Sequence, residues 1–321
     1  MIQRCVPLWL PLLLAPALSA ASRGAMERQV VAMGTRLTLA LEGPSQAQLE
    51  EATGAVLREV ERVEAACSTW RPDSPWSRLN RAAGAPVAMA PEWLDLLATA
   101  LDWSARTGGA FDPALQPLMA AWGIRDGGRT PVPQALAAAR SASGAAQVIL
   151  DRAAGSIRLL HPAAGLEEGG FLKGYALDTA KREALGHGCA SGLLNFGGQV
   201  LIWGRPRRVA IADPLRRNSP RLSVWLRQGS VSSSSCSERG RHILDPRTGE
   251  PCPAWGAVSV VADDGLSADI LSTALYVLGP REGLRWAAAH HVAAVFLPVG
   301  APALLSPAFR KLQPVFAGAG Q

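Results

Sequence analysis

The sequence predicts an α+β fold in which helices pack against mixed sheets, and three observations support this prediction. Segments with helical spacing of apolar residues alternate with segments rich in β-branched residues, but without the regular repeat of a doubly wound fold. The 321 residues are 48% hydrophobic and 18% charged, which provides a large core and excludes a disordered chain. No internal repeat, low-complexity tract or long linker separates two domains, so we expect residues 21–321 to form one compact unit.

The first twenty residues have the features of a cleavable export signal. Arg4 is their only charged residue, residues 6–18 are almost wholly apolar, and Ala20 ends the small-residue pattern that a signal peptidase requires. An apolar stretch of about 13 residues is too short to span a bilayer as a helix. We therefore expect residues 1–20 to be removed. The mature protein is then exported, most simply to a bacterial periplasm, without stable insertion in the membrane.

The next hundred residues are predicted to form a strand and two helices. Residues 29–42 are rich in Val, Leu and Thr, which favours a strand, and Gly34 interrupts it. A capping box opens a helix over residues 45–63, in which Leu, Ala and Val recur at helical spacing. A second helix follows Pro91, which suits a first helical turn, and ends at Gly108.

The second half of the chain is predicted to alternate between short strands and helices. Residues 147–151 and 156–160 read as a hairpin, and a helix over 174–187 follows. Two strands, 191–196 and 199–203, are separated by a pair of glycines. The remaining predicted elements are strands near 208–212, 222–227 and 256–262, a helix from Ser267 to Leu278 that ends at Gly279-Pro280, a last helix over 281–290, and a strand over 292–297.

Charge and cysteine usage exclude several classes of function. The net charge of +6 comes largely from arginines, but these are scattered and lack the interleaved aromatic residues that stack on single-stranded nucleic acid. We interpret them as a solvated surface and expect no nucleic-acid partner. The mature chain keeps Cys67, Cys189, Cys236 and Cys252, without a C-x-x-C pair, so neither a zinc ribbon nor a thioredoxin-like centre is expected. A Cys236–Cys252 bridge and unpaired, partly buried thiols both remain open.

A glycine-rich segment between Glu168 and Asp178, EGGFLKGYALD, indicates a phosphate site. It falls where a loop leads into a helix, so ligand phosphates can approach the backbone and the unpaired N–H groups of the helix start. Its spacing matches neither G-x-G-x-x-G nor G-x-x-x-x-G-K-[ST], which predicts a different phosphate chemistry from the two common loops. Taken alone, such a segment is more often a simple turn.

Two further segments carry candidate chemistry. Asp269 and Thr273 are four residues apart on a predicted helix capped by Ser267, so both oxygens can meet one hard cation. An aspartate in a first helical turn also complements the helix dipole without any metal, and spacing alone does not decide between the two. His242 precedes an Asp-Pro turn, with Asp245 three residues on, and is the best acid–base candidate among the five histidines.

Seven segments in this order resemble the ApbE family, the FAD:protein FMN transferases, over nearly all of the mature chain. They are Met33-Gly-Thr35; Cys67-Ser-Thr-Trp-Arg-Pro-Asp-Ser74 with Ser77-Arg-Leu-Asn80; Thr107-Gly-Gly-Ala-Phe-Asp112 with Pro117-Leu118; Gly169-Gly-Phe-Leu-Lys-Gly-Tyr-Ala-Leu-Asp178; Asn195-Phe-Gly-Gly198; His242-Ile-Leu-Asp-Pro-Arg-Thr-Gly249; and Ala268-Asp-Ile-Leu-Ser-Thr-Ala274. One such motif means little, but seven in order make coincidence very unlikely.

The resemblance implies a Mg²⁺-dependent reaction in which FAD is cleaved at its pyrophosphate. The FMN half is joined through phosphate to a threonine, or sometimes a serine, of an acceptor protein, and AMP leaves. The implied metal ligands are Asp269, Thr273 and the backbone carbonyl of Leu172. The residues that match the FAD site are Met33, Trp70, Ala110, Phe111, Asp112, Asp178, Lys181 and Leu244. His242, or Asp245, would take the proton of the acceptor hydroxyl. The implied partners are periplasmic redox proteins that carry flavin.

The chain departs from the family pattern at two places. Gln199 stands where the family commonly has an aspartate, and the segment from Ser232 to Arg241 is shorter than the usual hairpin before the histidine. The first departure predicts weaker binding of metal or substrate, and the second affects the choice of acceptor. Two alternatives follow. One is an FAD pyrophosphatase that releases free FMN and AMP, and the other is a flavin-binding protein without catalysis.

Overall fold

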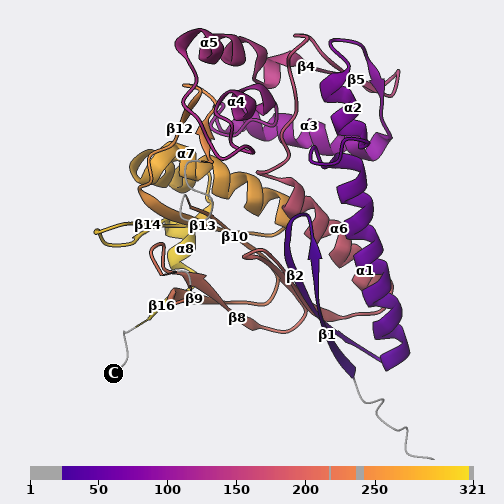
Figure 1. The fold of residues 1–321 in the computed structure, drawn as a ribbon. Coiled ribbons are helices and arrows are strands. Elements are labelled where there is room, and N and C mark those ends of the chain that lie inside the picture. The colour runs from indigo at the N-terminus through magenta and orange to yellow at the C-terminus, as the bar shows by residue number, and fades with distance from the viewer. Residues whose placement is uncertain (1–23, 217, 236–241, 318–321) are drawn as a thin grey trace, which may run out of the picture.

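An eight-stranded antiparallel sheet runs through the computed structural model, which describes residues 24–216, 218–235 and 242–317 (Figure 1). Its strand order is β1-β2-β6-β7-β10-β13-β14-β15. The bounds of these strands are β1 Gly24–Ala32, β2 Thr35–Gly43, β6 Ser191–Phe196, β7 Gln199–Trp203, β10 Gly229–Ser235, β13 Gly256–Ala262, β14 Ala293–Pro298 and β15 Leu304–Leu305. Successive strands are joined by hairpins at β1–β2 and β6–β7, where glycines at positive φ allow two-residue turns.

Three long helices cover one face of this sheet and enclose the main core. They are α1 Gln46–Cys67, α6 Leu172–Gly186 and α7 Gly265–Ala289. Alternate residues of β2, such as Leu37, Leu39 and Leu41, are fully buried against them, as expected of a sheet with one covered face. α6 lies between α1 and α7, so the glycine-rich segment at its start is placed beside the start of α7.

The opposite face of the large sheet is covered by a three-stranded sheet and a short helix. The strand order is β16-β9-β8, with β8 Arg207–Ala212, β9 Pro220–Leu226 and β16 Val315–Phe316, and the helix is α8 Pro307–Arg310. A second apolar cluster fills the space between the two sheets. It includes Ile202 and Val231 from the large sheet and Val224 from the small one. This part of the molecule therefore has three layers: the long helices, the large sheet and the small sheet (Figure 1).

The remaining elements form a helical part at the top of the view in Figure 1. They are α2 Pro75–Arg81, α3 Pro91–Arg106, α4 Gln116–Ala121 and α5 Pro133–Ala142, with a sheet of β3 Val87–Ala88, β4 Val148–Asp151 and β5 Ser156–Leu159, and the pair β11 Leu244–Asp245 and β12 Glu250–Pro251. A short 3₁₀ helix, Ala145–Gln147, precedes β4.

The structure confirms the predicted α+β class and corrects several boundaries. The strand predicted over 29–42 is the hairpin of β1 and β2, with Gly34 in its turn. The helix predicted from Ser267 begins at Gly265, because the side chain of Asp264, not that of Ser267, caps it by accepting from the backbone N–H of Ser267 at 2.6 Å. The two helices predicted to meet at Gly279-Pro280 form one run, α7, with a non-helical break at Gly279.

The described cysteines are all buried. Cys67 and Cys189 are free thiols, and burial raises the pKa of both. Cys252 is buried as well, but Cys236 lies outside the described residues, so the bridge between them stays untested. None of the helices in the described part of the chain has the length and apolar composition needed to cross a membrane.

Candidate functional site

The glycine-rich segment packs directly against the helix that carries Asp269 and Thr273. The backbone N–H of Gly174 donates to Oδ2 of Asp269 at 3.0 Å. A Cβ on Gly174 would lie 2.2 Å from the carbonyl oxygen of Gly265, so only glycine allows α6 and α7 to approach this closely. A Cβ on Gly170 would lie 3.3 Å from Oγ1 of Thr273. The fold therefore brings together the two segments that the sequence analysis had singled out separately.

Asp269 is a buried carboxylate in the second turn of α7. It is 5% exposed, and burial raises its pKa, while the positive charge of Lys173 acts in the opposite direction. Apart from the Gly174 N–H, its nearest hydrogen-bond partner is the hydroxyl of Ser232 at 3.5 Å. None of the ion pairs in the described part of the chain includes it. Because α7 begins at Gly265, Asp269 is not the first-turn residue that would simply complement the helix dipole.

The donor atoms at this point fit a magnesium ion. Mg²⁺ is typically held by one or two carboxylates together with substrate phosphates and water. Asp269 offers a carboxylate with acceptor capacity to spare, and Thr273 offers a hydroxyl one turn further along the same helix face. Leu172, the third implied ligand, begins α6 beside them. Among the described residues, no three His, Cys, Asp or Glu side chains are grouped so that they could hold a metal ion by themselves.

A row of buried serines and Gln199 lies next to Asp269. The hydroxyl of Ser272 on α7 lies 3.2 Å from that of Ser232 and 2.9 Å from that of Ser234, both on β10. Gln199 donates through Nε2 to the carbonyl of Gly265 at 2.8 Å, whereas its buried Oε1 has no hydrogen-bond partner among the described residues. Gln199 was indicated by the sequence as a departure from the family pattern, whereas the serines were not predicted as part of the site, although their run on β10 was a usable signal.

An arginine and two glutamates support Trp70, a residue predicted to line the FAD site. Trp70 is 61% exposed, and the guanidinium of Arg125 lies over its ring, 4.2 Å from the centroid. Arg125 pairs with Glu167 at 2.7 Å, and Thr69 donates to Glu168 through its backbone N–H and its hydroxyl. Burial, reinforced by the charge of Glu168, raises the pKa of Glu167 to about 7. The indole is thus fixed on one face and open to a planar ligand on the other.

Two of the predicted FAD-site carboxylates hold the backbone in place. Asp178 accepts from the N–H groups of Gly265 and Leu266 at 2.6 and 2.9 Å, which ties α6 to the start of α7. Burial raises the pKa of Asp178 to about 6. Asp112 accepts from two backbone N–H groups, those of Ala114 and Ala145, and burial also raises its pKa. Their contact with FAD stays a prediction, but the structure gives both of them a positioning role.

The apolar residues predicted for the FAD site differ in exposure. Ala110 and Phe111 are buried, and the ring of Phe111 meets that of Phe171 edge to face at 5.9 Å. A Cβ on Gly170 would lie 3.3 Å from the ring of Phe111, so both this ring and Thr273 border the glycine-rich loop. Lys181 is half-buried on α6, one turn after Asp178.

The hairpin turn at Met33 meets the turn between β6 and β7. Met33 is half-buried and has a φ of 45°, a left-handed conformation that is costly for a residue with a side chain, and its backbone N–H donates to Glu64. A Cβ on Gly197 would lie 2.8 Å from the hydroxyl of Thr35. The Met-Gly-Thr and Asn-Phe-Gly-Gly motifs, 160 residues apart, are therefore neighbours.

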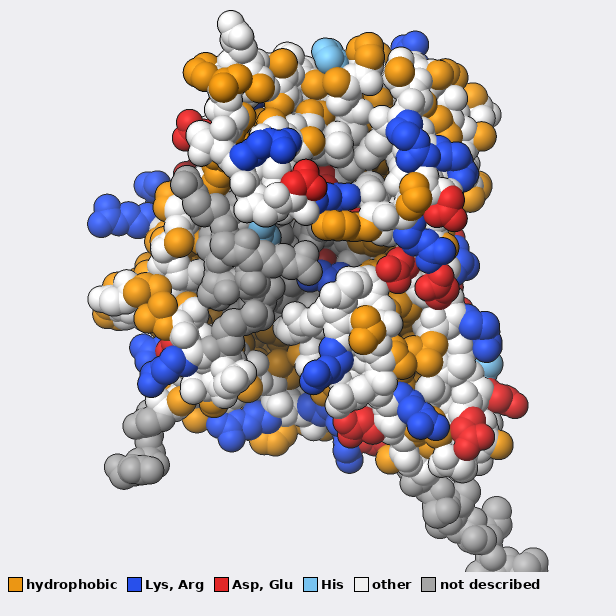
Figure 2. Space-filling model, in the orientation of Figure 1, with side chains coloured by type: hydrophobic (Ala, Val, Ile, Leu, Met, Phe, Trp, Pro, Cys, Tyr) orange, Lys and Arg blue, Asp and Glu red, His pale blue; other side chains and the backbone are white. Residues whose placement is uncertain are grey.

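The histidine segment leads into β11. His242 is half-buried directly before this strand, and Leu244 is buried against Leu118. Both carboxylate oxygens of Asp245 accept from the Arg247 guanidinium at 2.9 Å. Figure 2 shows acidic and basic side chains around the middle of this side of the molecule, between the helical part and the sheets.

Comparison with known proteins shows the family to which this chain belongs. The sequence profile of the ApbE family matches residues 33–296. The chain belongs to the ApbE family. An ApbE-family protein from Rhodobacter capsulatus, named FAD:protein FMN transferase, is 33% identical over 82% of this chain, and the match spans 53% of that relative, about half of its length. A protein of the same name from Klebsiella pneumoniae is 30% identical over 78% of this chain and 77% of its own.

Solved ApbE structures have the same fold. The flavinyl transferase ApbE of Pseudomonas stutzeri, in its apo form, superposes with a TM-score of 0.81 at 29% identity, over 90% of this chain and 97% of its own. The ApbE protein of Thermotoga maritima gives 0.82 at 25% identity, over 90% and 99%. The ApbE resemblance predicted from the seven motifs and the α+β class are both confirmed.

Proposed function

We propose that this chain catalyses the reaction for which its relatives are named, and transfers the FMN moiety of FAD to a hydroxyl of an acceptor protein. The observation that carries the proposal is the packing of the glycine-rich segment on Asp269 and Thr273. This contact joins a phosphate-binding loop to the two oxygen donors of a divalent cation. A chain that only carried flavin would have no need of such a clamp.

Asp269, Thr273 and the Leu172 carbonyl would hold Mg²⁺, which would neutralise developing charge on the pyrophosphate of FAD. The hydroxyl oxygen of an acceptor threonine or serine forms a bond to the phosphorus of the FMN half. The bond from that phosphorus to the bridging oxygen breaks, and AMP leaves with the electron pair. His242 takes the hydroxyl proton, a contribution of about 10² to 10⁴-fold in rate for a general base.

The other residues of the site bind and orient FAD. The exposed indole of Trp70, held from behind by Arg125, offers a stacking surface for a planar ring of FAD. Gly170 leaves the Thr273 hydroxyl accessible, and its own backbone N–H can approach a phosphate oxygen without obstruction by a side chain. The neighbouring N–H groups of Gly169 and Phe171 already donate to Glu167 and to the carbonyl of Glu168. Asp112 and Asp178 keep the surrounding loops in position.

The proposed setting is outside the cytoplasm. The leader in residues 1–20 supports export, most simply to a periplasm, and the acceptor would then be an exported redox protein with a flavin-carrying domain. Residues 236–241, next to His242 and outside the described residues, belong to the short segment that we expect to influence which acceptor is taken.

The test is transfer of mass to an acceptor. The protein is incubated with FAD, Mg²⁺ and several exported flavin-acceptor domains, and covalent FMN is measured by intact-protein mass spectrometry. We expect Asp269→Asn and Thr273→Val each to lower the transfer rate by about 10²-fold or more, since each removes a metal ligand. Asparagine retains an acceptor for the Gly174 N–H, so urea unfolding should show that the fold persists.

The products distinguish the alternatives. Free FMN and AMP without modified acceptor would mean that water replaces the hydroxyl, as in an FAD pyrophosphatase. Tight binding of FAD with no AMP released in the presence of Mg²⁺ would mean that the chain only binds flavin, and would overturn the proposal. Normal transfer by Asp269→Asn would refute the assignment of the metal ligand.

A further inference from the structure

The outer face of the small sheet gathers arginines that are scattered in the sequence. Arg208 on β8 lies opposite Trp225 on β9, and their side chains share the face turned away from the second core. Trp225 is 60% exposed, and its neighbours Arg221 and Arg227 are exposed too. None of the three described strands of this sheet contains a carboxylate. The result is a cationic face with an uncovered indole in it.

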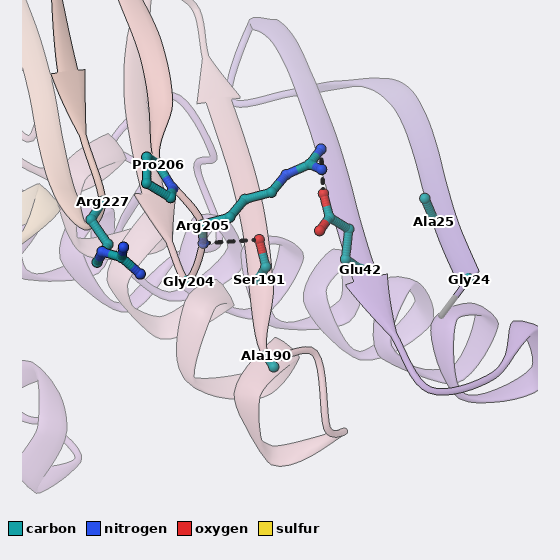
Figure 3. A pocket seen from close by; sticks show the side chains of 9 residues that line it. All are labelled: Gly24, Ala25, Glu42, Ala190, Ser191, Gly204, Arg205, Pro206 and Arg227. Atoms are coloured by element: carbon teal, nitrogen blue, oxygen red, sulfur yellow. Dashed lines mark hydrogen bonds and ion pairs between the residues drawn. The ribbon is translucent and has the colours of Figure 1, made fainter. Parts of the chain in front are cut away.

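The cationic face extends to a cavity beside the start of β1. This cavity of about 590 Å³ is lined by Arg205 and Arg227, with Gly24 at its edge (Figure 3). Glu42 is its carboxylate, and it pairs with Arg205 at 2.6 Å and with Arg207 at 2.8 Å. Glu42 pairs with two arginines and Arg227 is a third basic residue beside the cavity, so the region keeps a positive charge. Lys and Arg side chains, with some Asp and Glu side chains among them, lie on the lower part of the molecule in Figure 2.

Exposed apolar side chains occur on the same sheet. Besides Trp225, Leu215 is 71% exposed in the loop between β8 and β9, and Val315 on β16 is 49% exposed. Val315 pairs with Ser223, two residues from Trp225, so it projects to the same side. A Trp, aliphatic side chains and arginines together match the composition of surfaces that bind at the level of lipid headgroups.

The cationic face is on the opposite side of the large sheet from the candidate site. Ser232 of β10 faces α7 and Asp269, whereas the preceding residue, Val231, faces the second core under the small sheet. A partner bound to the small sheet therefore leaves α7 and the glycine-rich loop accessible to FAD and to an acceptor protein.

We propose that the outer face of β8, β9 and β16 binds the headgroups of an anionic phospholipid bilayer. Arginines attract the negative surface of such a bilayer, and a Trp prefers its interface, whereas a purely polar anion would gain nothing from Trp225 and Leu215. The proposal does not depend on the FMN-transfer reaction.

The test compares two triple variants with equal loss of charge. R208Q/R221Q/R227Q removes the arginines of the cationic face, and R58Q/R158Q/R285Q removes three exposed arginines from α1, β5 and α7. The protein is purified in the form in which it accumulates in its host. Its co-sedimentation is measured with anionic vesicles, made of phosphatidylglycerol and phosphatidylcholine, and with neutral vesicles made of phosphatidylcholine alone. An arginine near an anionic surface contributes about fivefold, so the first triple variant should bind anionic vesicles about 10²-fold more weakly. The control variant should bind like the wild type.

A second measurement locates the contact. Brominated lipids quench tryptophans at the interface, so quenching in anionic vesicles should largely disappear in Trp225→Phe. It should persist in Trp70→Phe, the other exposed tryptophan among the described residues. Equal binding by both triple variants, unchanged quenching in Trp225→Phe, or the absence of binding to anionic vesicles would each overturn the proposal. Binding of an acidic polypeptide but not of vesicles would likewise show that the face serves a protein partner instead.

Discussion

At the scale of single residues, buried polar groups define the site more than exposed ones do. Asp269, predicted as a metal ligand, is almost fully buried, and burial raises its pKa. A buried carboxylate without a cationic partner is costly, which is the situation that a bound divalent ion relieves. Gln199 binds the carbonyl of Gly265, one helical turn before Asp269, and its neutral side chain adds no charge to this environment.

Gln199 gives a prediction about metal binding. Gln199→Asp restores the residue common in the family, but removes the donor to the Gly265 carbonyl and adds a second buried carboxylate. We expect it to lower the free energy of unfolding by about 1–3 kcal/mol without metal. Added Mg²⁺ should recover part of that loss, because the new carboxylate strengthens the site. Gln199→Ala is the control, and equal Mg²⁺-dependent shifts of Tm in both variants would contradict this explanation.

At the scale of elements, the contact between α6 and α7 positions the site. Gly174 allows the helices to approach, Asp178 binds the first N–H groups of α7, and Asp264 caps the same end. The sequence indicated both helices but not their contact, because the hydrogen bonds that Asp178 and Asp269 accept across it join residues 87 to 95 positions apart.

The contact predicts different effects for two glycines of α6. Gly174→Ala places a methyl group 2.2 Å from a backbone carbonyl, which cannot move as a side chain can, so we expect it to destabilise the fold by about 3 kcal/mol or more. Gly186→Ala meets nothing within 4 Å at the end of the same helix, and should be neutral or stabilising by about 0.5–1 kcal/mol. Urea unfolding measures both changes. Similar stabilities for the two variants would mean that the helices do not pack this closely.

Asp178 predicts a pH dependence of stability. Its pKa is raised to about 6 in the folded protein, above the ordinary 3.8, so the folded state binds the proton more tightly than the unfolded state does. The corresponding stability is fully present below about pH 4 and is lost as the pH rises through 6, an effect of about 2–3 kcal/mol. The difference in unfolding free energy between wild type and Asp178→Asn should therefore change across pH 4 to 6. A constant difference would contradict the raised pKa.

At the scale of the whole molecule, local patterns predicted the strongest elements and left the arrangement open. The strand over 256–262 is predicted with its observed bounds, because it is bounded by turn residues and rich in valine. α5 was not predicted, since its buried residues are two alanines, Ala139 and Ala142, and no large apolar side chain on it is fully buried. The pairing of Arg125 with Trp70, 55 residues earlier, and the gathering of arginines on the small sheet depend on tertiary contacts that sequence spacing does not contain.

The seven motifs were recognisable in the sequence because each is a short continuous segment. Their contacts with one another appear only in the folded structure. Gly170, Gly174, Asp269 and Thr273 form one contact, and the turns at Met33 and Gly197 form another. Together they connect the sheet, α6 and α7 around one region. The chemistry we propose requires this whole arrangement, since a phosphate loop and a cation clamp act on the same pyrophosphate.

The most direct measurement is the position of a divalent ion in the presence of FAD. Crystals grown with FAD and Mn²⁺, whose anomalous scattering identifies it, should show one ion in contact with the Asp269 carboxylate, the Thr273 hydroxyl and both phosphates of FAD. The Asp269→Asn protein should lose this peak while its fold is unchanged. An ion bound elsewhere on FAD, or FAD phosphates that lie away from the start of α6, would contradict the account.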